Sequence, residues 1–219
     1  MLDTVIFDMD GLLIDSEPLW QKAGMEALRI FGAEITLQQY YNTTGLRTPE
    51  WIEYWFNHFG IGSAHMREAV KTIEDKAIEH IRQDAIAFPG TPYIIDFFSE
   101  RKFKIGLATS SPLRLVDVVV EKLGIANLLD AVASAEHLPL GKPHPQVYIN
   151  CAASLSVSPL QCLCFEDSFN GMIAAKAARM KCVAVPVPEQ FEEPKWGAAD
   201  LCLDSLLNFD DRLLEQLRS

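Results

Sequence analysis

The sequence predicts an α/β protein: a doubly wound, Rossmann-like parallel sheet with an inserted helical segment. Short apolar runs of strand length alternate with helix-length amphipathic segments along most of the chain. The apolar runs show little polar alternation, as expected for parallel strands that are buried on both faces. One interval, roughly residues 16–88, carries helical patterns and no convincing strand. Because a simple crossover needs only about a dozen residues, we interpret this interval as an insertion.

The first strand is expected at Thr4–Phe7, where β-branched residues precede the acidic turn Asp8–Gly11. The insertion follows, and Pro89–Gly90 would mark the return of the chain to the sheet. The expected domains are therefore a sheet domain of residues 1–15 and 89–219 and a helical domain of residues 16–88. Inside the insertion, helices are expected at Pro18–Phe31, Thr48–Phe59 and Ala64–Gln83.

The remaining elements alternate between strand and helix, which predicts right-handed crossovers in one parallel sheet. Gly124 is a suitable residue to end one of these helices, and Ser168 is a suitable N-cap for another. Further strands are expected at Phe103–Ala108, Ala131–Ala133, Cys162–Phe165, Cys182–Val185 and Leu201–Leu203. Further helices are expected at Thr91–Arg101, Leu113–Leu123, Gln146–Leu155 and Phe169–Ala178.

Composition restricts the possible partners. The 219 residues carry 19 basic and 30 acidic side chains, a net charge of −11, and no long Lys/Arg run, which argues against nucleic acid as a partner. No apolar run approaches the ~18 residues of a membrane span, and the start of the chain lacks the basic stretch of a secretory signal. The five cysteines include no C-x-x-C pair and are expected to be free thiols. We therefore expect a cytoplasmic protein that binds a small molecule.

Polar side chains follow three of the expected strands at their carboxyl ends. In an open parallel sheet these ends lie along one rim, and ligands bind there. The rim would bring together Asp8 and Asp10 after the first strand, Thr109 and Ser110 after the second, Glu166 and Asp167 after the fourth, and Lys142 from the loop before the Gln146 helix.

This set suits phosphoryl transfer. Crowded carboxylates repel one another and favour a hard cation such as Mg²⁺, while Lys142 and Thr109 could bind phosphate oxygens. One aspartate, Asp8, could attack phosphorus and the other, Asp10, could protonate the leaving oxygen. Taken singly, each motif is also typical of a helix cap or a solvated loop. Their joint occurrence at strand ends favours the functional interpretation.

Four motifs together resemble those of the haloacid dehalogenase superfamily, and the helical insertion resembles its C1-type cap. The motifs are Phe7-Asp8-Met9-Asp10-Gly11, Ala108-Thr109-Ser110, Gly141-Lys142-Pro143 and Glu166-Asp167-Ser168. The similarity covers essentially the whole chain, and it implies a monomer, the default state for this group. It is closest to the β-phosphoglucomutase-like phosphatases, and within them to the 2-deoxyglucose-6-phosphate and hexitol phosphatases.

The resemblance implies specific roles. Asp8 would be the nucleophile and Asp10 the general acid/base. Mg²⁺ would be held by Asp8, the Asp10 carbonyl and Asp167, with Glu166 in or just behind the first shell of ligands. Residues binding the phosphoryl group would be Thr109, Ser110 and Lys142. Asn170 lies where related enzymes often place a polar residue near the site.

The cap residues expected nearest the substrate are Trp20, Gly45, Arg47 and Trp51. An exposed loop position for Arg47 and a cap-core position for Trp51 are the competing interpretations. The sequence also departs from the family at Gln146, where many relatives have Asp, and at Arg179, where many have Gly.

The expected activity is Mg²⁺-dependent hydrolysis of small sugar or polyol phosphates, with 2-deoxyglucose 6-phosphate as an example. Related mutases carry a His at the position of Trp20. The absence of that His favours hydrolysis over the alternative of a β-phosphoglucomutase-type mutase. A non-catalytic phospho-acceptor module is a third alternative. It fits less well because such modules are about half this length, have no cap and place the acceptor on a middle strand.

Overall fold

The computed structural model describes residues 2–41, 43 and 46–218, and the chain divides into two compact units. The sheet unit comprises Met1–Asp15 and Ala87–Ser219, and the helical unit comprises Ser16–Ile86. None of the helices in the described part of the chain has the length and apolar character needed to cross a membrane.

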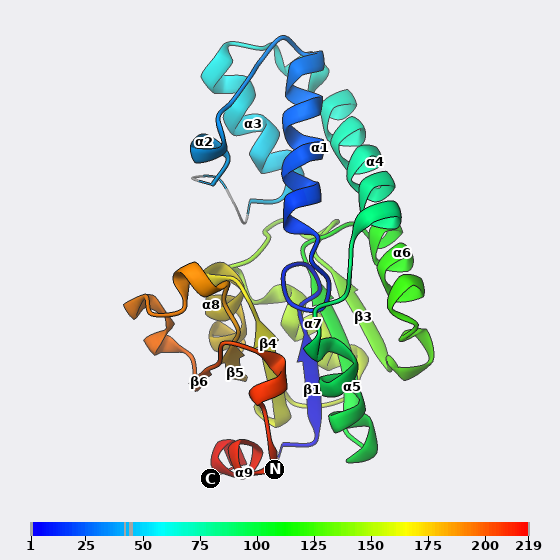
Figure 1. The fold of residues 1–219 in the computed structure, drawn as a ribbon, viewed down its shortest axis with the longest axis vertical. Coiled ribbons are helices and arrows are strands. Elements are labelled where there is room, and N and C mark those ends of the chain that lie inside the picture. The colour runs from blue at the N-terminus through cyan, green and yellow to red at the C-terminus, as the bar shows by residue number, and fades with distance from the viewer. Residues whose placement is uncertain (1, 42, 44–45, 219) are drawn as a thin grey trace. The chain divides into compact units, whose positions relative to one another are not determined.

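The sheet unit is built on a parallel sheet with strand order β3-β2-β1-β4-β5-β6 (Figure 1). Its strands are β1 Thr4–Phe7, β2 Lys104–Thr109, β3 Ala131–Ser134, β4 Cys162–Glu166, β5 Lys181–Ala184 and β6 Leu201–Cys202. The chain runs from β1 outward to β3 and then returns to place β4 on the other side of β1. The order therefore reverses between β1 and β4, and such a switch point is where open parallel sheets bind ligands. This architecture confirms the predicted fold class.

Side chains alternate across the two faces of the sheet. On one face, the rings of Phe7 and Phe165 pack against each other and against Phe98 of α5 (Gly90–Glu100). Phe209 packs against Phe98 and Phe165, and all these ring centroids lie 5.0–6.0 Å apart. On the other face, Ile6 and its neighbours on β4 and β5 form a buried cluster with α7 (Gln146–Ser154) and α8 (Phe169–Ala177). Both faces are thus covered by apolar side chains, which explains why the strands read as continuous apolar runs.

The helices of the sheet unit are α5 Gly90–Glu100, α6 Leu113–Leu123, α7 Gln146–Ser154, α8 Phe169–Ala177 and α9 Asp211–Arg218. Helices α5 to α8 lie close to their expected positions. Gly124 follows α6 with φ +68°, and the Ser168 hydroxyl accepts the Gly171 N–H at the start of α8, 3.0 Å away, as the sequence predicts. Helix α9 lies beyond the sequence predictions; its leucines 213, 214 and 217 are buried.

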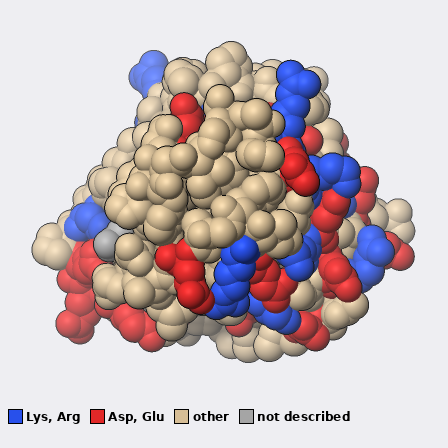
Figure 2. Space-filling view, turned by 90° about the horizontal axis from the view of Figure 1, so that it is seen from above, with Lys and Arg blue, Asp and Glu red and all other residues tan. Residues whose placement is uncertain are grey.

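The helical unit contains α1 Glu17–Ile30, α2 Leu37–Tyr41, α3 Thr48–Phe59 and α4 Met66–Asp84. Three of these correspond to the expected helices, and the five-residue α2 was not predicted. Helices α1 and α4 pack along each other, and a Lys76–Glu26 ion pair of 2.9 Å joins them. The face shown in Figure 2 carries basic and acidic side chains interspersed, with no area formed by Lys and Arg alone.

Candidate active site

The site lies at the carboxyl ends of β1, β2 and β4. Asp8 directly follows β1, and its backbone N–H donates to the Phe165 carbonyl 3.0 Å away, which continues the pairing of β1 with β4. Glu166 is the last residue of β4, and Asp167 follows it. Asp8 and Glu166 are buried, with 7% and 0% of their surfaces exposed. The switch point of the sheet therefore brings acids from two distant stretches of chain together.

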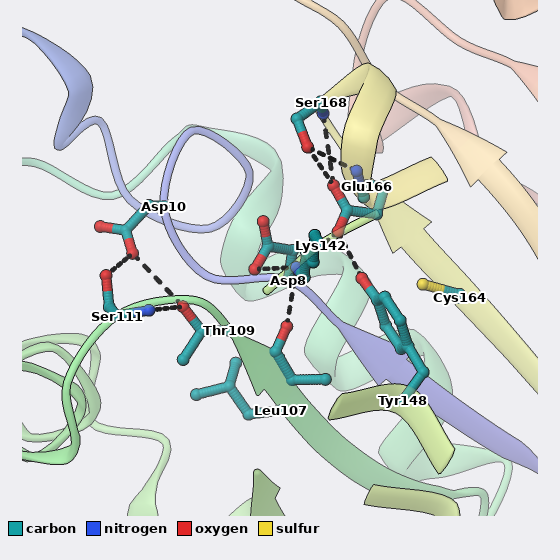
Figure 3. A network of polar contacts seen from close by, with 12 residues as sticks. Asp8, Asp10, Leu107, Thr109, Ser111, Lys142, Tyr148, Cys164, Glu166 and Ser168 are labelled. Carbon is teal, nitrogen blue, oxygen red and sulfur yellow. Dashed lines mark hydrogen bonds and ion pairs between the residues drawn. The ribbon is translucent and has the colours of Figure 1, made fainter. Parts of the chain in front are cut away.

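Lys142 reaches this group from the loop before α7 (Figure 3). Its ammonium lies 2.8 Å from Asp8 Oδ1 and 2.6 Å from Glu166 Oε1, and it donates to the Ala108 carbonyl at 3.1 Å. Three acceptors thus match its three N–H groups. Burial opposes the charge on Lys142, but Asp8 and Glu166 outweigh it and raise the lysine pKa above its ordinary value.

The electrostatic balance at Asp8 is different. Burial and repulsion from Glu166 raise the pKa of Asp8 to about 7, against the opposing effect of Lys142. Asp8, Glu166 and Asp167 each offer a carboxylate oxygen within 4.8 Å of the others. Lys142 pairs with both Asp8 and Glu166, so the three carboxylates and this lysine together carry a charge of −2. A divalent cation would neutralise this charge, and oxygen donors suit a hard ion.

Gly11 makes room for this arrangement. It has φ +74°, and a Cβ there would lie 2.2 Å from Asp167 Oδ2. Only a residue without a side chain lets the loop after β1 approach the Asp167 carboxylate so closely. The donor set, its charge and this cradle all fit a divalent metal ion.

Asp10 lies on the other side of Asp8, in the loop after β1 (Figure 3). Its Oδ2 accepts from the Ser111 hydroxyl at 2.6 Å and from the Thr109 hydroxyl at 3.5 Å. The Ser111 N–H in turn donates to the Thr109 hydroxyl oxygen at 3.0 Å. Ser110, between these residues, directly follows β2. The loop after β2 therefore orients the Asp10 carboxylate.

Tyr148, in the first turn of α7, is a site residue that the sequence predictions missed. Its hydroxyl donates a hydrogen bond to Glu166 Oε1, and burial raises its pKa well above the ordinary value, so it stays protonated. The sequence did offer one indication, since Tyr148 comes only six residues after Lys142. A buried tyrosine hydroxyl normally needs a polar partner, and the predicted site could supply one. Ser111 was also missed as a partner of Asp10.

The predicted cap residues lie in the helical unit. Trp20 is half-buried in α1. Trp51, 6% exposed, packs against Tyr40 and Trp55 with ring centroids 5.8 and 6.2 Å apart. Arg47 is the residue directly before α3, with its guanidinium 2.6 Å from Glu50. Gly45 lies outside the described residues.

Known proteins resemble this chain in sequence and in fold. The model of the haloacid dehalogenase-like hydrolase family matches residues 5–185. Hexitol phosphatase B of Escherichia coli K12 is 41% identical over 202 residues, covering 92% of this chain and 91% of that protein. A fructose-1-phosphate phosphatase of the same organism is 30% identical over 188 residues, covering 83% of this chain and 95% of that protein.

Among solved structures, β-phosphoglucomutase from Clostridium difficile superimposes with a TM-score of 0.84 at 23% identity, covering 99% of this chain and 96% of that one. This similarity supports the fold. Because the family model spans most of the chain and the 41% identical relative is covered almost end to end, the assignment is firm. The chain belongs to the haloacid dehalogenase-like hydrolases and is an enzyme of the phosphatase type.

Proposed function

We propose that this enzyme hydrolyses phosphate monoesters of small sugars or polyols, depends on Mg²⁺ and acts through an aspartyl phosphate on Asp8. The observation that carries the proposal is the cluster at the β1/β4 switch point, where Asp8 lies 2.8 Å from the Lys142 ammonium and beside two further acids. The similarity to hexitol phosphatase B supports the substrate class.

The metal would be held by the carboxylates of Asp8 and Asp167 and by the main-chain carbonyl of Asp10, with Glu166 behind them. When bound, Mg²⁺ would neutralise charge and orient the phosphoryl group. Phosphate oxygens would be bound by Lys142, the Thr109 hydroxyl and the Ser110 N–H. This assignment follows from the fit of the acid cluster and from the position of the loop after β2.

In the first step, an oxygen of Asp8 attacks phosphorus and the P–O bond to the sugar breaks. Asp10 donates its proton to the leaving alkoxide oxygen. In the second step, Asp10 takes a proton from water, whose oxygen attacks phosphorus. The acyl phosphate bond then breaks, inorganic phosphate leaves, and the Asp8 carboxylate and protonated Asp10 are restored.

The helical unit, proposed to be the cap of residues 16–88, would contact the leaving group. Trp20, Gly45, Arg47 and Trp51 are its candidate substrate residues. Glu50 balances the charge of Arg47, so we assign that arginine to sugar hydroxyls rather than to phosphate. The five cysteines are free, and four are buried, which supports the proposed reducing, cytoplasmic compartment.

A phosphate-release assay tests the proposal. The purified enzyme would be given hexose, deoxyhexose, hexitol and nucleotide monophosphates with Mg²⁺, and again with a chelator. We expect phosphate release from the sugar or hexitol phosphates, lost on chelation and restored by Mg²⁺. Interconversion of sugar phosphates without release would indicate a mutase, and undiminished turnover in the chelator would contradict the metal assignment.

A further inference from the structure

Glu166 is held by protein donors on both of its oxygens. Oε1 accepts from Lys142 at 2.6 Å and from the Tyr148 hydroxyl, and Oε2 accepts from the Ser168 N–H and hydroxyl at 3.3 and 3.0 Å. Four donors fill the usual acceptor capacity of a carboxylate. Its hydrogen-bond acceptor positions are therefore filled by donors of this chain, although the residue is fully buried.

The carboxylate is also fixed by packing. A Cβ on Gly171, in the first turn of α8, would lie 1.9–2.1 Å from the carboxylate atoms of Glu166. Glu166 therefore rests directly on the backbone at the amino end of α8, where the helix dipole favours negative charge. It has little room to turn unless one of its donors is lost.

Tyr148 touches both members of the Lys142–Glu166 pair. Its hydroxyl donates to Glu166, and the Lys142 ammonium lies 5.0 Å from the centre of its ring. The ring is fully buried. Because Lys142 also binds Asp8, the hydroxyl of Tyr148 is linked through Glu166 and then Lys142 to the carboxylate that would attack phosphorus (Figure 3).

We propose that Tyr148 is a positioning residue: its hydroxyl keeps the Glu166 carboxylate turned toward Lys142, which holds that lysine against Asp8. Without it, Oε1 keeps Lys142 as its single donor, and part of the buried carboxylate is left unsatisfied, so the carboxylate is no longer fixed in its present rotamer. Lys142 would then lose its fixed place. The consequence for turnover rests on the proposed function, whereas the consequence for Lys142 does not.

The first test is spectroscopic and needs no substrate. In metal-free protein labelled with ¹⁵N, the ammonium signal of Lys142, assigned by its loss in Lys142→Met, should exchange slowly because all three N–H groups are bound. Tyr148→Phe should broaden or shift it. Tyr93→Phe is the matched control, because its hydroxyl donates to the Phe209 carbonyl at 2.7 Å, away from the site. That variant should leave the signal unchanged.

The second test separates positioning from stability. Tyr148→Phe should lower kcat about tenfold with KM within twofold, and Tyr93→Phe should lower the melting temperature without lowering kcat. If Tyr148 acts through Glu166, Tyr148→Phe should cost little further activity in a Glu166→Gln background.

Three results would each overturn the inference. They are an unchanged Lys142 signal in Tyr148→Phe, a kcat of Tyr148→Phe within twofold of wild type, and activity losses of Tyr148→Phe and Glu166→Gln that multiply when the two are combined. Wild-type protein that releases no phosphate from any ester, yet shows the spectral change, would contradict only the proposed function.

Discussion

The two edges of the sheet use the same residue types in opposite ways. At the amino edge, where the strands begin, carboxylates accept hydrogen bonds from the backbone. Asp130 accepts from the Ile105 N–H and Asp200 accepts from the Cys182 N–H, both at 2.8 Å. At the carboxyl edge, Asp8, Glu166 and Asp167 face one another. The carboxylates of the amino edge thus satisfy backbone N–H groups, whereas those of the carboxyl edge concentrate negative charge.

Two aspartates show the difference in their pKa values. Burial opposes ionisation of Asp200, but hydrogen bonds from Lys176 and the Cys182 N–H outweigh it and lower the pKa. Burial and Glu166 raise the pKa of Asp8 to about 7, despite Lys142. A carboxylate that stabilises the fold thus has its charge matched, whereas one at a functional site can be left short of positive charge.

The largest contrast is expected between the two ends of β1. Asp8→Asn should lower turnover by at least about 10³-fold, because the attacking oxygen is removed. Asp3→Asn is the matched control: its carboxylate, at the other end, accepts from Thr4 and Gln161 at 2.9 and 3.2 Å. It should keep activity within about twofold. Steady-state phosphate release measures both, and comparable losses would erase the distinction between the edges.

Replacing a lysine at each edge comes next. Lys142→Met leaves Asp8 and Glu166 without their shared ammonium and should lower the free energy of unfolding by about 3–5 kcal/mol. The side chain of Lys176 is 32% exposed and pairs with Asp200. Lys176→Met should therefore lower the free energy of unfolding by about 1 kcal/mol or less. Urea unfolding of metal-free protein compares them, and equal losses would contradict the account.

Glycine positions give a finer test. Gly171→Ala places a Cβ within 2.1 Å of the Glu166 carboxylate and should cost about 1–3 kcal/mol of stability, with a clear loss of kcat. Gly197→Ala is the control, since nothing lies within 4 Å of its added Cβ. Thermal unfolding and kcat are the measurements; a fully active Gly171→Ala enzyme would argue against a fixed Glu166.

Stability as a function of pH probes the Asp8 charge directly. With its folded pKa raised from 3.8 to about 7, Asp8 costs stability as pH rises through this interval, by on the order of 4 kcal/mol. Metal-free Asp8→Asn should therefore be more stable than wild type at pH 8, and the gap should close toward pH 4. Asp200→Asn should be less stable than wild type at pH 8, because a lowered pKa contributes stability that is lost on acidification.

The smallest expected change in stability is for a substitution at the amino edge. Arg179, between α8 and β5, has φ +65°, a left-handed conformation that costs a side-chain-bearing residue about 1–2 kcal/mol. Arg179→Gly should raise stability by about 0.5–1 kcal/mol after the entropy cost of glycine, with no change in kcat. Thermal unfolding detects this, and a lower melting temperature would contradict it. The same position is a departure from the family pattern in the sequence.

Much of the fold was predictable because its signals are local. The bounds of α3 and α6 match the expected helices, since apolar periodicity and a following glycine mark both. Helices α2 and α9 were missed because five and eight residues give too little periodicity to separate a helix from a loop. The strand order was not predicted, because it depends on pairing across long stretches of chain.

The site was predictable in its residues more than in its contacts. Asp8 and Glu166 could be predicted as neighbours because both follow or end parallel strands, whose carboxyl ends lie along one rim of the sheet. The Tyr148 hydroxyl and the Gly171 cradle were not identified, because they depend on how α7 and α8 pack against β4. Those are tertiary contacts that no spacing rule encodes.

The central claim, that Asp8 accepts a phosphoryl group beside a metal held with Asp167, is tested most directly by a crystal structure with Mg²⁺ and beryllium fluoride, a mimic of the aspartyl phosphate. The account predicts a fluoroberyllate bonded to an Asp8 carboxylate oxygen, the ion bound by Asp8 and Asp167, and the Lys142 ammonium on a fluorine. An ion bound elsewhere, or an Asp8 carboxylate that carries no fluoroberyllate at saturating concentration, would contradict it.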